Sequence, residues 1–392
     1  MNFQRIENID VKGKRVFVRA DLNLPIEAGK FKDSIRISKL LPTLELLIRK
    51  GAKVILGTNY GSPESGNKES TKPIYDSVVA QIKQIRFADT IELSELEKAS
   101  HSLSEGDCLF LENLNNYEGE VKNDPEFAEK FSKIADIFVN EAFSLAHKNL
   151  ATTVGITKFL PSYPGTLFFR EIESLSNLIQ RPDKPFVAII GGSKVSSKLK
   201  ILNSLLSRAN TILIGGGMSY TFLKSRAIPV GSSVIEKDYE VLSHQFIDKA
   251  GIAGVEFQMP IDHVIADSFG DKAKTKNVDK MGIIDGWMGM DIGSKTISNY
   301  EKIIKNAGTI FWTGPMGVIE LEKFGNGSLA IAKAIAKSNA KSVIGGEDTV
   351  GAVIKAGVSD KITHLSIGGG AALEFLEGKT LPAIKALIKE EE

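Results

Sequence analysis

Cysteine is nearly absent from this sequence, which contains only Cys108 among its 392 residues. A disulfide within the chain needs two cysteines, so we expect none, and this usage is typical of a reducing compartment. No stretch approaches the roughly 20 consecutive apolar residues that a membrane-spanning helix requires. The polar first ten residues, MNFQRIENID, lack the apolar segment of a signal peptide. These absences predict a cytoplasmic protein without a membrane partner.

The sequence also lacks an excess of charge of either sign, because 49 basic and 48 acidic residues give a formal net charge of +1. Proteins that bind nucleic acids usually carry a strong positive field. We therefore expect no nucleic-acid partner, but a small-molecule ligand that is held by a local cluster of charges. The apolar fraction of 42% is ordinary for a globular protein. The length predicts two domains of roughly 150–200 residues each.

What the sequence does contain is an alternation of strand-like and helix-like segments. This order favours an α/β fold in which helices cover a parallel sheet. In the first half, strands are expected at residues 15–19, 52–56, 108–111 and 137–139, and helices at residues 35–50, 74–85 and 125–134. The proline-containing segment 159–164 predicts a domain boundary, which a helix over residues 168–180 would follow.

In the second half, glycines follow the ends of five strand-like segments. Ligands of open α/β sheets bind beyond the carboxyl ends of the strands, and glycine lets the backbone approach a phosphate closely. Five such turns indicate a nucleotide-binding crevice, and glycines that only form tight turns are the alternative. The turns lie at residues 191–192, 215–217, 314–317, 345–346 and 368–370.

One of these turns carries two lysines. Residues 185–200, PFVAIIGGSKVSSKLK, predict a buried strand, two glycines and a helix that begins at Ser193. The start of such a helix can bind an anion, and Lys194 and Lys198, four residues apart, would share one helical face. A bound polyphosphate would explain this pair, whereas two solvated surface lysines are the alternative. The segment lacks the glycine that precedes Lys-Ser/Thr in a Walker A loop.

These segments resemble the phosphoglycerate kinase family over nearly the whole chain. Residues 16–25, VFVRADLNLP, are similar to a family signature, and Arg36 stands at the place of its catalytic arginine. In the C-terminal half, six segments follow in the family's order: GGSKVSSK, GGGMSYTFLK, WMGMDIG, GPMGVIE, GGEDT and SIGGGAALEFLEGKTLP. The resemblance implies two Rossmann-like domains with parallel sheets, joined by a hinge helix.

The resemblance also implies what each part does. Residues 1–167 and 376–392 would form an N-terminal acid-substrate domain, residues 168–182 a linker helix, and residues 183–375 a C-terminal nucleotide-binding domain. The implied reaction is phosphoryl transfer between 1,3-bisphosphoglycerate or 3-phosphoglycerate and ADP or ATP, a step of glycolysis. Mg²⁺ is the implied cofactor, and an acid substrate and an adenine nucleotide are the implied partners. The chain would be a monomer whose domains close about the hinge.

Matching positions imply the site residues. Arg36, Lys194, Gly346 and Gly369 would stabilise the transferring phosphoryl group, and Asp348 would hold the metal. The nucleotide would contact Gly191, Gly192, Lys194, Lys198, Gly215, Gly289, Glu320, Gly346, Glu347, Asp348 and Thr349. The acid would contact Arg19, Asp21, Asn23, Arg36, Asn59, Ser62, Asn115, His147 and Lys148.

Several acid-side positions depart from the family pattern. Asn59 replaces a histidine, Ser62 and Asn115 replace arginines, and Lys148 replaces a further arginine. Asparagine does not reproduce the two-pronged hydrogen bonding of arginine to phosphate, and lysine does so only in part. A phosphorylated acid should therefore bind more weakly than the family pattern provides. On the nucleotide side, an asparagine, a glycine and a threonine are replaced by Thr313, Glu347 and Ile367.

The sequence thus leaves three hypotheses. The first is a phosphoglycerate kinase with an altered acid site. The second is a kinase of the same fold that acts on a different, less anionic carboxylate. The third is a non-catalytic nucleotide-binding relative. A two-lobed solute-binding protein would be a fourth, but it conflicts with the missing export signal.

Overall fold

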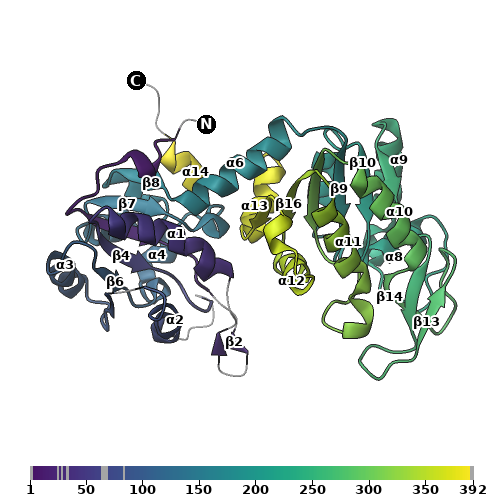
Figure 1. Cartoon of the computed structure of the whole chain (residues 1–392), viewed down its shortest axis with the longest axis horizontal. Helices are drawn as coiled ribbons and strands as arrows, with labels where there is room; N and C mark the ends of the chain where they lie inside the picture. Colours follow the sequence, from purple (N-terminus) through teal and green to yellow (C-terminus); the bar gives the residue numbers. More distant parts are fainter. Residues whose placement is uncertain are drawn as a thin grey trace. The chain divides into compact units, whose positions relative to one another are not determined.

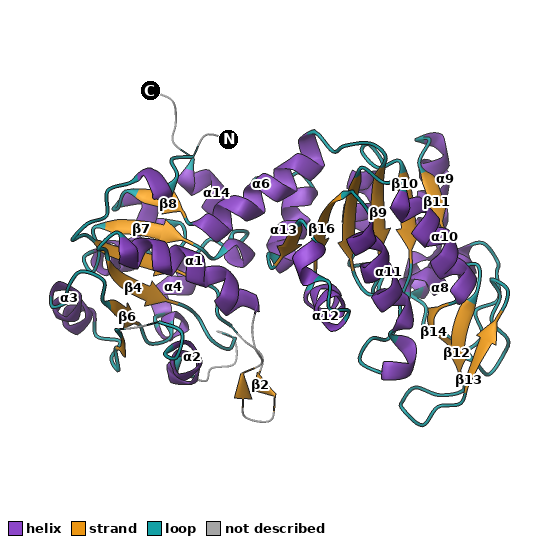
Figure 2. Ribbon diagram, in the orientation of Figure 1, coloured by secondary structure: helices purple, strands orange, loops and turns teal. Residues whose placement is uncertain are grey.

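The two halves of the chain form separate units. The computed structural model describes residues 3–23, 26–27, 30–31, 35–62, 69–82 and 84–388. The first unit comprises Met1–Glu173 with Lys379–Glu392, and the second comprises Ser174–Gly378. The boundary between them falls inside α6 (Thr166–Gln180). Each unit is built on a six-stranded sheet with helices on its faces (Figures 1 and 2).

The sheet of the first unit has the strand order β5-β6-β4-β1-β7-β8, and every neighbouring pair is parallel. Its strands are β1 (Arg15–Arg19), β4 (Lys53–Gly57), β5 (Ile85–Phe87), β6 (Cys108–Phe110), β7 (Ile137–Asn140) and β8 (Ser162–Pro164), with a separate hairpin of β2 (Ile26–Glu27) and β3 (Lys30–Phe31). Its helices are α1 (Ile35–Arg49), α2 (Lys72–Val78), α3 (Leu93–His101), α4 (Glu118–Lys122), α5 (Pro125–Ser132) and α14 (Pro382–Leu387).

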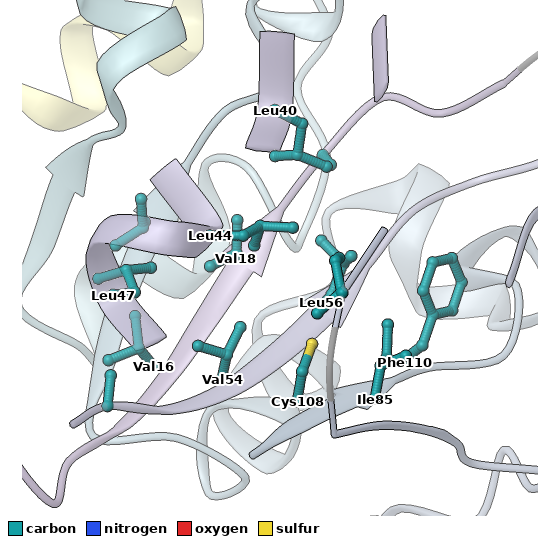
Figure 3. Packing of buried hydrophobic residues seen from close by; sticks show 14 of the residues in the cluster. Val16, Val18, Leu40, Leu44, Leu47, Val54, Leu56, Ile85, Cys108 and Phe110 are labelled. Carbon is teal, nitrogen blue, oxygen red and sulfur yellow. The ribbon is translucent and has the colours of Figure 1, made fainter. Parts of the chain in front are cut away.

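Side chains cover both faces of this sheet, because successive residues of β1 join core clusters on opposite faces. Val16 and Val18 join a core cluster on one face with Leu44 of α1 (Figure 3). Phe17 belongs to the cluster on the other face, where its ring centroid lies 5.1 Å from that of Phe131 in α5. Strands that are buried on both faces carry apolar residues at successive positions. This burial explains the short apolar runs of the sequence.

The second unit has a parallel sheet of order β11-β10-β9-β15-β16-β17 and an antiparallel sheet of order β13-β12-β14. The parallel strands are β9 (Phe186–Ile190), β10 (Thr211–Ile214), β11 (Glu256–Gln258), β15 (Thr309–Thr313), β16 (Lys341–Gly345) and β17 (His364–Ser366). The antiparallel strands are β12 (His263–Ala266), β13 (Thr275–Val278) and β14 (Met288–Ile292). The helices are α7 (Leu199–Leu205), α8 (Met218–Ser225), α9 (Glu240–Ile252), α10 (Ser294–Lys305), α11 (Asn326–Lys337), α12 (Glu347–Lys355) and α13 (Gly369–Leu376).

The predicted α/β class with parallel sheets is confirmed, whereas some local predictions are wrong. The sequence predicts one helix over residues 74–85, but α2 ends at Val78 and a strand begins at Ile85. Ile85 pairs with Cys108 of β6. Pairing with a strand later in the chain thus determines the structure at Ile85, although the spacing of the apolar residues indicated a helix. The segment expected to be only a boundary contains β8, and the antiparallel sheet was not predicted.

The end of the chain packs within the first unit. Ala383, in the first turn of α14, donates its backbone N–H to the carbonyl oxygen of Ala146 over 3.1 Å. Residues 389–392 of the segment expected to return there lie outside the described residues, as do Leu24 and Pro25 of the N-terminal signature. Among the helices of the described part of the chain, none combines the length and apolarity needed to cross a membrane.

Candidate active site

In the first unit, the predicted acid-side residues gather where parallel strands end. Arg19 is the last residue of β1, Asn59 follows β4, Asn115 follows β6 and His147 follows β7. Because these strands are neighbours in one parallel sheet, their carboxyl ends share one edge. The sheet topology therefore brings together four segments that are far apart in the sequence.

Arg19 lies inside the unit and is fully buried. Its guanidinium donates to Thr152 Oγ1 over 2.9 Å and to Asn59 Oδ1 over 3.0 Å, and it lies 3.7 Å from Glu120 Oε1. Burial lowers the pKa of Arg19 and raises that of Glu120, and the attraction between the two charges opposes both shifts. Thr152 donates its hydroxyl to Glu120 over 2.6 Å. Protein groups thus satisfy the arginine that the sequence assigned to the substrate.

Arg36, in the first turn of α1, forms an ion pair with Asp21 and is 25% exposed. The same carboxylate accepts a hydrogen bond from the hydroxyl of Ser144. The backbone N–H of Asn23 also donates to Asp21, over 3.2 Å. Asp21 therefore orients the predicted catalytic arginine, and Ser144 fixes Asp21. The sequence did not single out Ser144, although it lies in the same polar loop as His147.

Amide side chains organise the loop at residues 59–62. Asn23 Oδ1 accepts from the N–H of Gly61 over 3.1 Å, and Asn115 Nδ2 donates to the carbonyl of Tyr60 over 3.2 Å. Asn113, which the sequence did not single out, makes two hydrogen bonds to the backbone of Tyr60. Its Oδ1 accepts the N–H of Tyr60 over 3.0 Å, and its Nδ2 donates to the carbonyl oxygen over 2.9 Å. Asn115 thus braces the loop backbone at a position where the resemblance places an arginine.

The remaining acid-side candidates are less enclosed. Ser62 and Lys148 are exposed, and His147 is half-buried. The N–H of Lys148 donates to the carbonyl of Leu145 over 2.9 Å, which closes a short turn. Lys148 is therefore a cation that can reach a ligand in solvent without breaking a buried contact.

In the second unit, three of the predicted glycine turns pack against one another. Gly192 donates its N–H to the carbonyl of Pro315 over 2.9 Å, and Gly216 donates to that of Met316 over 2.8 Å. A Cβ atom at Gly191 would lie 2.2 Å from the oxygen of Pro315, and one at Gly215 would lie 2.5 Å from the sulfur of Met316. Close packing against residues 315 and 316 is by itself enough to require glycine at positions 191 and 215.

The glycines after β16 and β17 have different surroundings. Gly346 directly precedes α12 with a φ of +95°, and Gly369 begins α13 with a φ of +52°. A Cβ atom at Gly369 or Gly370 would meet nothing within 4 Å. The backbone at Gly369 and Gly370 therefore faces open space, which a ligand can occupy. A Cβ atom at Gly346, by contrast, would lie 3.3 Å from Thr349 Oγ1 and 3.4 Å from Thr313 Oγ1.

The expectation that Lys194 and Lys198 share a helical face is wrong. Helix α7 begins at Leu199, and Ser193 to Lys198 form a loop in which Lys198 donates its N–H to the carbonyl of Val195 over 2.8 Å. Ser196 is held by Glu236, which accepts its hydroxyl over 2.6 Å and its N–H over 3.0 Å. Burial alone would raise the pKa of Glu236, but these bonds and one from Val195 keep it below the ordinary value. A carboxylate 40 residues away thus holds a segment that the sequence predicted to be helical.

Lys198 nevertheless reaches other predicted residues. Its Nζ lies 3.5 Å from Thr313 Oγ1 at the end of β15. Burial lowers the pKa of Lys198, and the nearby carboxylate of Asp348 acts in the opposite direction. Thr349, next to Asp348 in α12, accepts the N–H of Gly314 over 2.7 Å. Groups from the ends of β9, β15 and β16, which are neighbours in the sheet, therefore meet at one place.

The nucleotide-side candidates differ in burial. Lys194, Glu320, Glu347 and Asp348 are exposed. Gly289 donates its N–H to Ser233 over 2.9 Å, and a Cβ atom there would lie 2.1 Å from the ring of Tyr220. The described residues contain no cluster of three or more metal-ligating side chains. Asp348 is the candidate ligand for a metal that the nucleotide would bring.

The sequence model of the phosphoglycerate kinase family matches residues 6–379. The chain belongs to the phosphoglycerate kinase family. It is 55% identical over 395 residues to the phosphoglycerate kinase of Leptospira biflexa serovar Patoc, with 100% of both chains covered. It is 43% identical to that of Clostridium botulinum, with 99% of both covered. These findings confirm the family that the sequence motifs indicated.

Solved structures of phosphoglycerate kinases share the fold. The structure of phosphoglycerate kinase from Coxiella burnetii superposes with a TM-score of 0.87 at 36% identity, covering 98% of this chain and 99% of that one. The crystal structure of phosphoglycerate kinase from Pyrococcus horikoshii OT3 gives a TM-score of 0.85 at 32% identity, covering 98% of each. The phosphoglycerate kinase fold is thus present over 98% of the chain.

Proposed function

We propose that this protein transfers a phosphoryl group between 1,3-bisphosphoglycerate and ADP, and in reverse between ATP and 3-phosphoglycerate. The first unit would bind the acid and the second the nucleotide. The observation that carries the proposal is the meeting of Lys198, Thr313 and Asp348 at the ends of neighbouring strands, in a chain similar over its full length to named phosphoglycerate kinases. Phosphoryl transfer depends mainly on positioning and charge neutralisation, which such a cluster provides.

On the nucleotide side, Lys198 would neutralise phosphate oxygens and Lys194 would neutralise the group in transfer. The open backbone at Gly369 and Gly370 would approach the same oxygens, and Gly346 would do so from its place beside Thr313 and Thr349. Mg²⁺ usually keeps several waters and binds one or two carboxylates together with phosphates. The exposed carboxylate of Asp348 fits this pattern, because it lies near the cation of Lys198, which would face the same phosphates. When bound, the metal would supply further charge neutralisation.

On the acid side, Arg36 would stabilise charge on the transferring group, with Asp21 and Ser144 orienting it. His147 and Lys148 would contact the acid from the loop after β7, and Asn23, Ser62 and Asn115 from the facing loops. Arg19 would act by holding Asn59 in place, since its own donors are used inside the unit. We further propose a cytoplasmic monomer, in keeping with the single cysteine and the formal net charge of +1.

A kinase that acts on a less anionic carboxylate is the second candidate. The bracing of the loop backbone by Asn115 favours it, because this side chain supplies no positive charge for a second phosphate. Calorimetry distinguishes the candidates: Mg-ADP is titrated into the protein first, and 3-phosphoglycerate second, alongside a coupled assay of turnover. Binding of both with turnover supports the proposal. Binding of the nucleotide alone would favour either a kinase for another carboxylate or a non-catalytic nucleotide-binding relative. Binding of neither ligand would contradict all three hypotheses.

A further inference from the structure

A carboxylate outside the predicted site connects three elements of the first unit. Glu141 follows β7 directly, is 3% exposed, and precedes the loop that carries Ser144, His147 and Lys148. One carboxylate oxygen accepts the N–H of Leu167 over 3.3 Å, and the other accepts that of Phe168 over 2.8 Å. Both donors belong to the first turn of α6, whose free N–H groups and dipole favour an anion.

The third element is α1, the helix that begins beside Arg36. Thr43 of this helix is fully buried, donates its hydroxyl to Glu141, and shares a hydrogen bond with the hydroxyl of Thr166. The backbone N–H of Glu141 donates to the carbonyl of Arg19 over 2.8 Å. A Cβ atom at position 165 would lie 2.1 Å from the carboxyl carbon of Glu141. Gly165 therefore leaves the space that the carboxylate needs in order to reach α6.

Burial raises the pKa of Glu141 to about 7, because removing a charged group from water costs free energy that an apolar side chain does not incur. A carboxyl group offers several hydrogen-bond acceptor sites at one point. Here these acceptor sites receive hydrogen bonds from two helices, at the point where the loop of residues 142–148 begins. The arrangement orients the loop rather than merely filling the core.

We propose that Glu141 is a positioning residue for the acid-substrate half of the site. By holding the start of α6 and the middle of α1 at one point, it sets where the loop of residues 142–148 presents His147 and Lys148 relative to Arg36. This inference rests on the proposed function, since it names the acid substrate as the ligand affected. It assigns no contact between Glu141 and the substrate.

Glu141→Gln tests the inference, because an amide keeps the size but replaces one acceptor oxygen with a donor. We expect the KM for 3-phosphoglycerate to rise about tenfold, the effect of weakening one charge-assisted hydrogen bond. The KM for Mg-ATP should stay within about twofold. Hydrogen exchange should quicken at the amides of Leu167 and Phe168 and across residues 142–148. Thr43→Val, which removes one donor to the carboxylate, should change the same quantities in the same direction if the first variant does not fold.

Asp262→Asn is the matched control. Asp262 is also a buried carboxylate at the start of a helix, where it accepts the N–H groups of Lys295 and Thr296 over 2.8 Å each in the second unit. The variant Asp262→Asn should destabilise the protein without changing the KM for the acid. An equal rise in acid KM in both variants, or unchanged exchange over residues 142–148 in Glu141→Gln, would overturn the inference. If the wild type turns over no 3-phosphoglycerate, the proposed function fails, while the exchange comparison still decides the role of Glu141.

Discussion

Arg19 and Glu120 form an ion pair in the interior of the first unit, with side-chain exposures of 0% and 1%. The two residues lie about as deep as the apolar core and are joined through Thr152. Replacing one member of such a pair leaves an unpaired buried charge, which is strongly destabilising. The pair therefore also supports the position of Asn59, which accepts a hydrogen bond from Arg19 over 3.0 Å.

Glu120→Gln should lower the free energy of unfolding by about 3–5 kcal/mol, because Arg19 then lacks its counter-charge. Urea denaturation at neutral pH measures this change. Asp76→Asn is the control, since its partner Lys72 is 49% exposed and the pair lies on the surface. Exposed pairs of this spacing contribute about 0.5 kcal/mol or less. Equal effects of the two variants would contradict the structural role assigned to the buried pair.

Arg36→Ala should lower kcat by about 10³-fold or more, as expected for a cation that stabilises transferring phosphoryl charge. Binding of Mg-ADP should be unchanged, because Arg36 belongs to the unit proposed to bind the acid. Steady-state kinetics and calorimetry test the two parts. Ser38→Ala, an exposed position in the same helix, should retain wild-type turnover. Unchanged kcat in Arg36→Ala would show that another residue supplies the charge.

Lys198→Met should weaken Mg-ADP binding about 10- to 100-fold, since a charge-assisted contact to phosphate contributes about 1.5–3 kcal/mol. Methionine retains most of the length of the side chain, so packing around Thr313 changes little. Lys200→Met provides the comparison, because Lys200 is exposed and lies two residues further along. Calorimetric titration distinguishes them. Similar affinities for both variants would place the phosphates away from Lys198.

The pH dependence of stability should reflect Asp291. This side chain is buried and accepts the N–H of Gly327 over 2.7 Å, yet burial dominates and raises its pKa to about 7. A carboxyl group with a raised pKa in the folded state stabilises at low pH, and this contribution is lost as the pH rises from about 4 to about 7. The loss amounts to roughly 4 kcal/mol.

The measurement compares unfolding of the wild type and of Asp291→Asn between pH 4 and pH 8. The variant carries no ionisable group at this position, so its free energy of unfolding should fall less steeply with pH than that of the wild type. The difference between the two curves isolates Asp291 from the other carboxylates. Parallel curves would show that Asp291 remains ionised in the folded protein.

The sequence could predict what depends on local patterns. The parallel sheets follow from short apolar runs, such as that of β9, which are separated by helical segments and glycines. Partners far along the chain were not predictable in this way. Glu120 lies 101 residues after Arg19, and nothing near Arg19 indicates that its guanidinium is used internally.

The same limit explains the error at Lys194 and Lys198. Their spacing fits a helix, but Glu236 holds Ser196 in a loop from 40 residues away. Glu141 was also missed, because its role depends on Thr43 and Phe168 meeting it in space. Residue types at a site are visible in the sequence, whereas the groups that hold them in place become visible only in the fold.

The interlocked turns at Gly191, Gly215 and Gly314 have a consequence for how this site can evolve. A Cβ atom at Gly314 would lie 2.1 Å from the carbonyl oxygen of Gly191, so these turns are joined through main-chain atoms that every amino acid shares. Side chains of neighbouring residues also hold these turns, since Thr349 Oγ1 accepts the N–H of Gly314 over 2.7 Å. Substitutions are therefore best tolerated at exposed positions nearby, such as Glu347, whereas any side chain at Gly191 or Gly314 would force the turns apart.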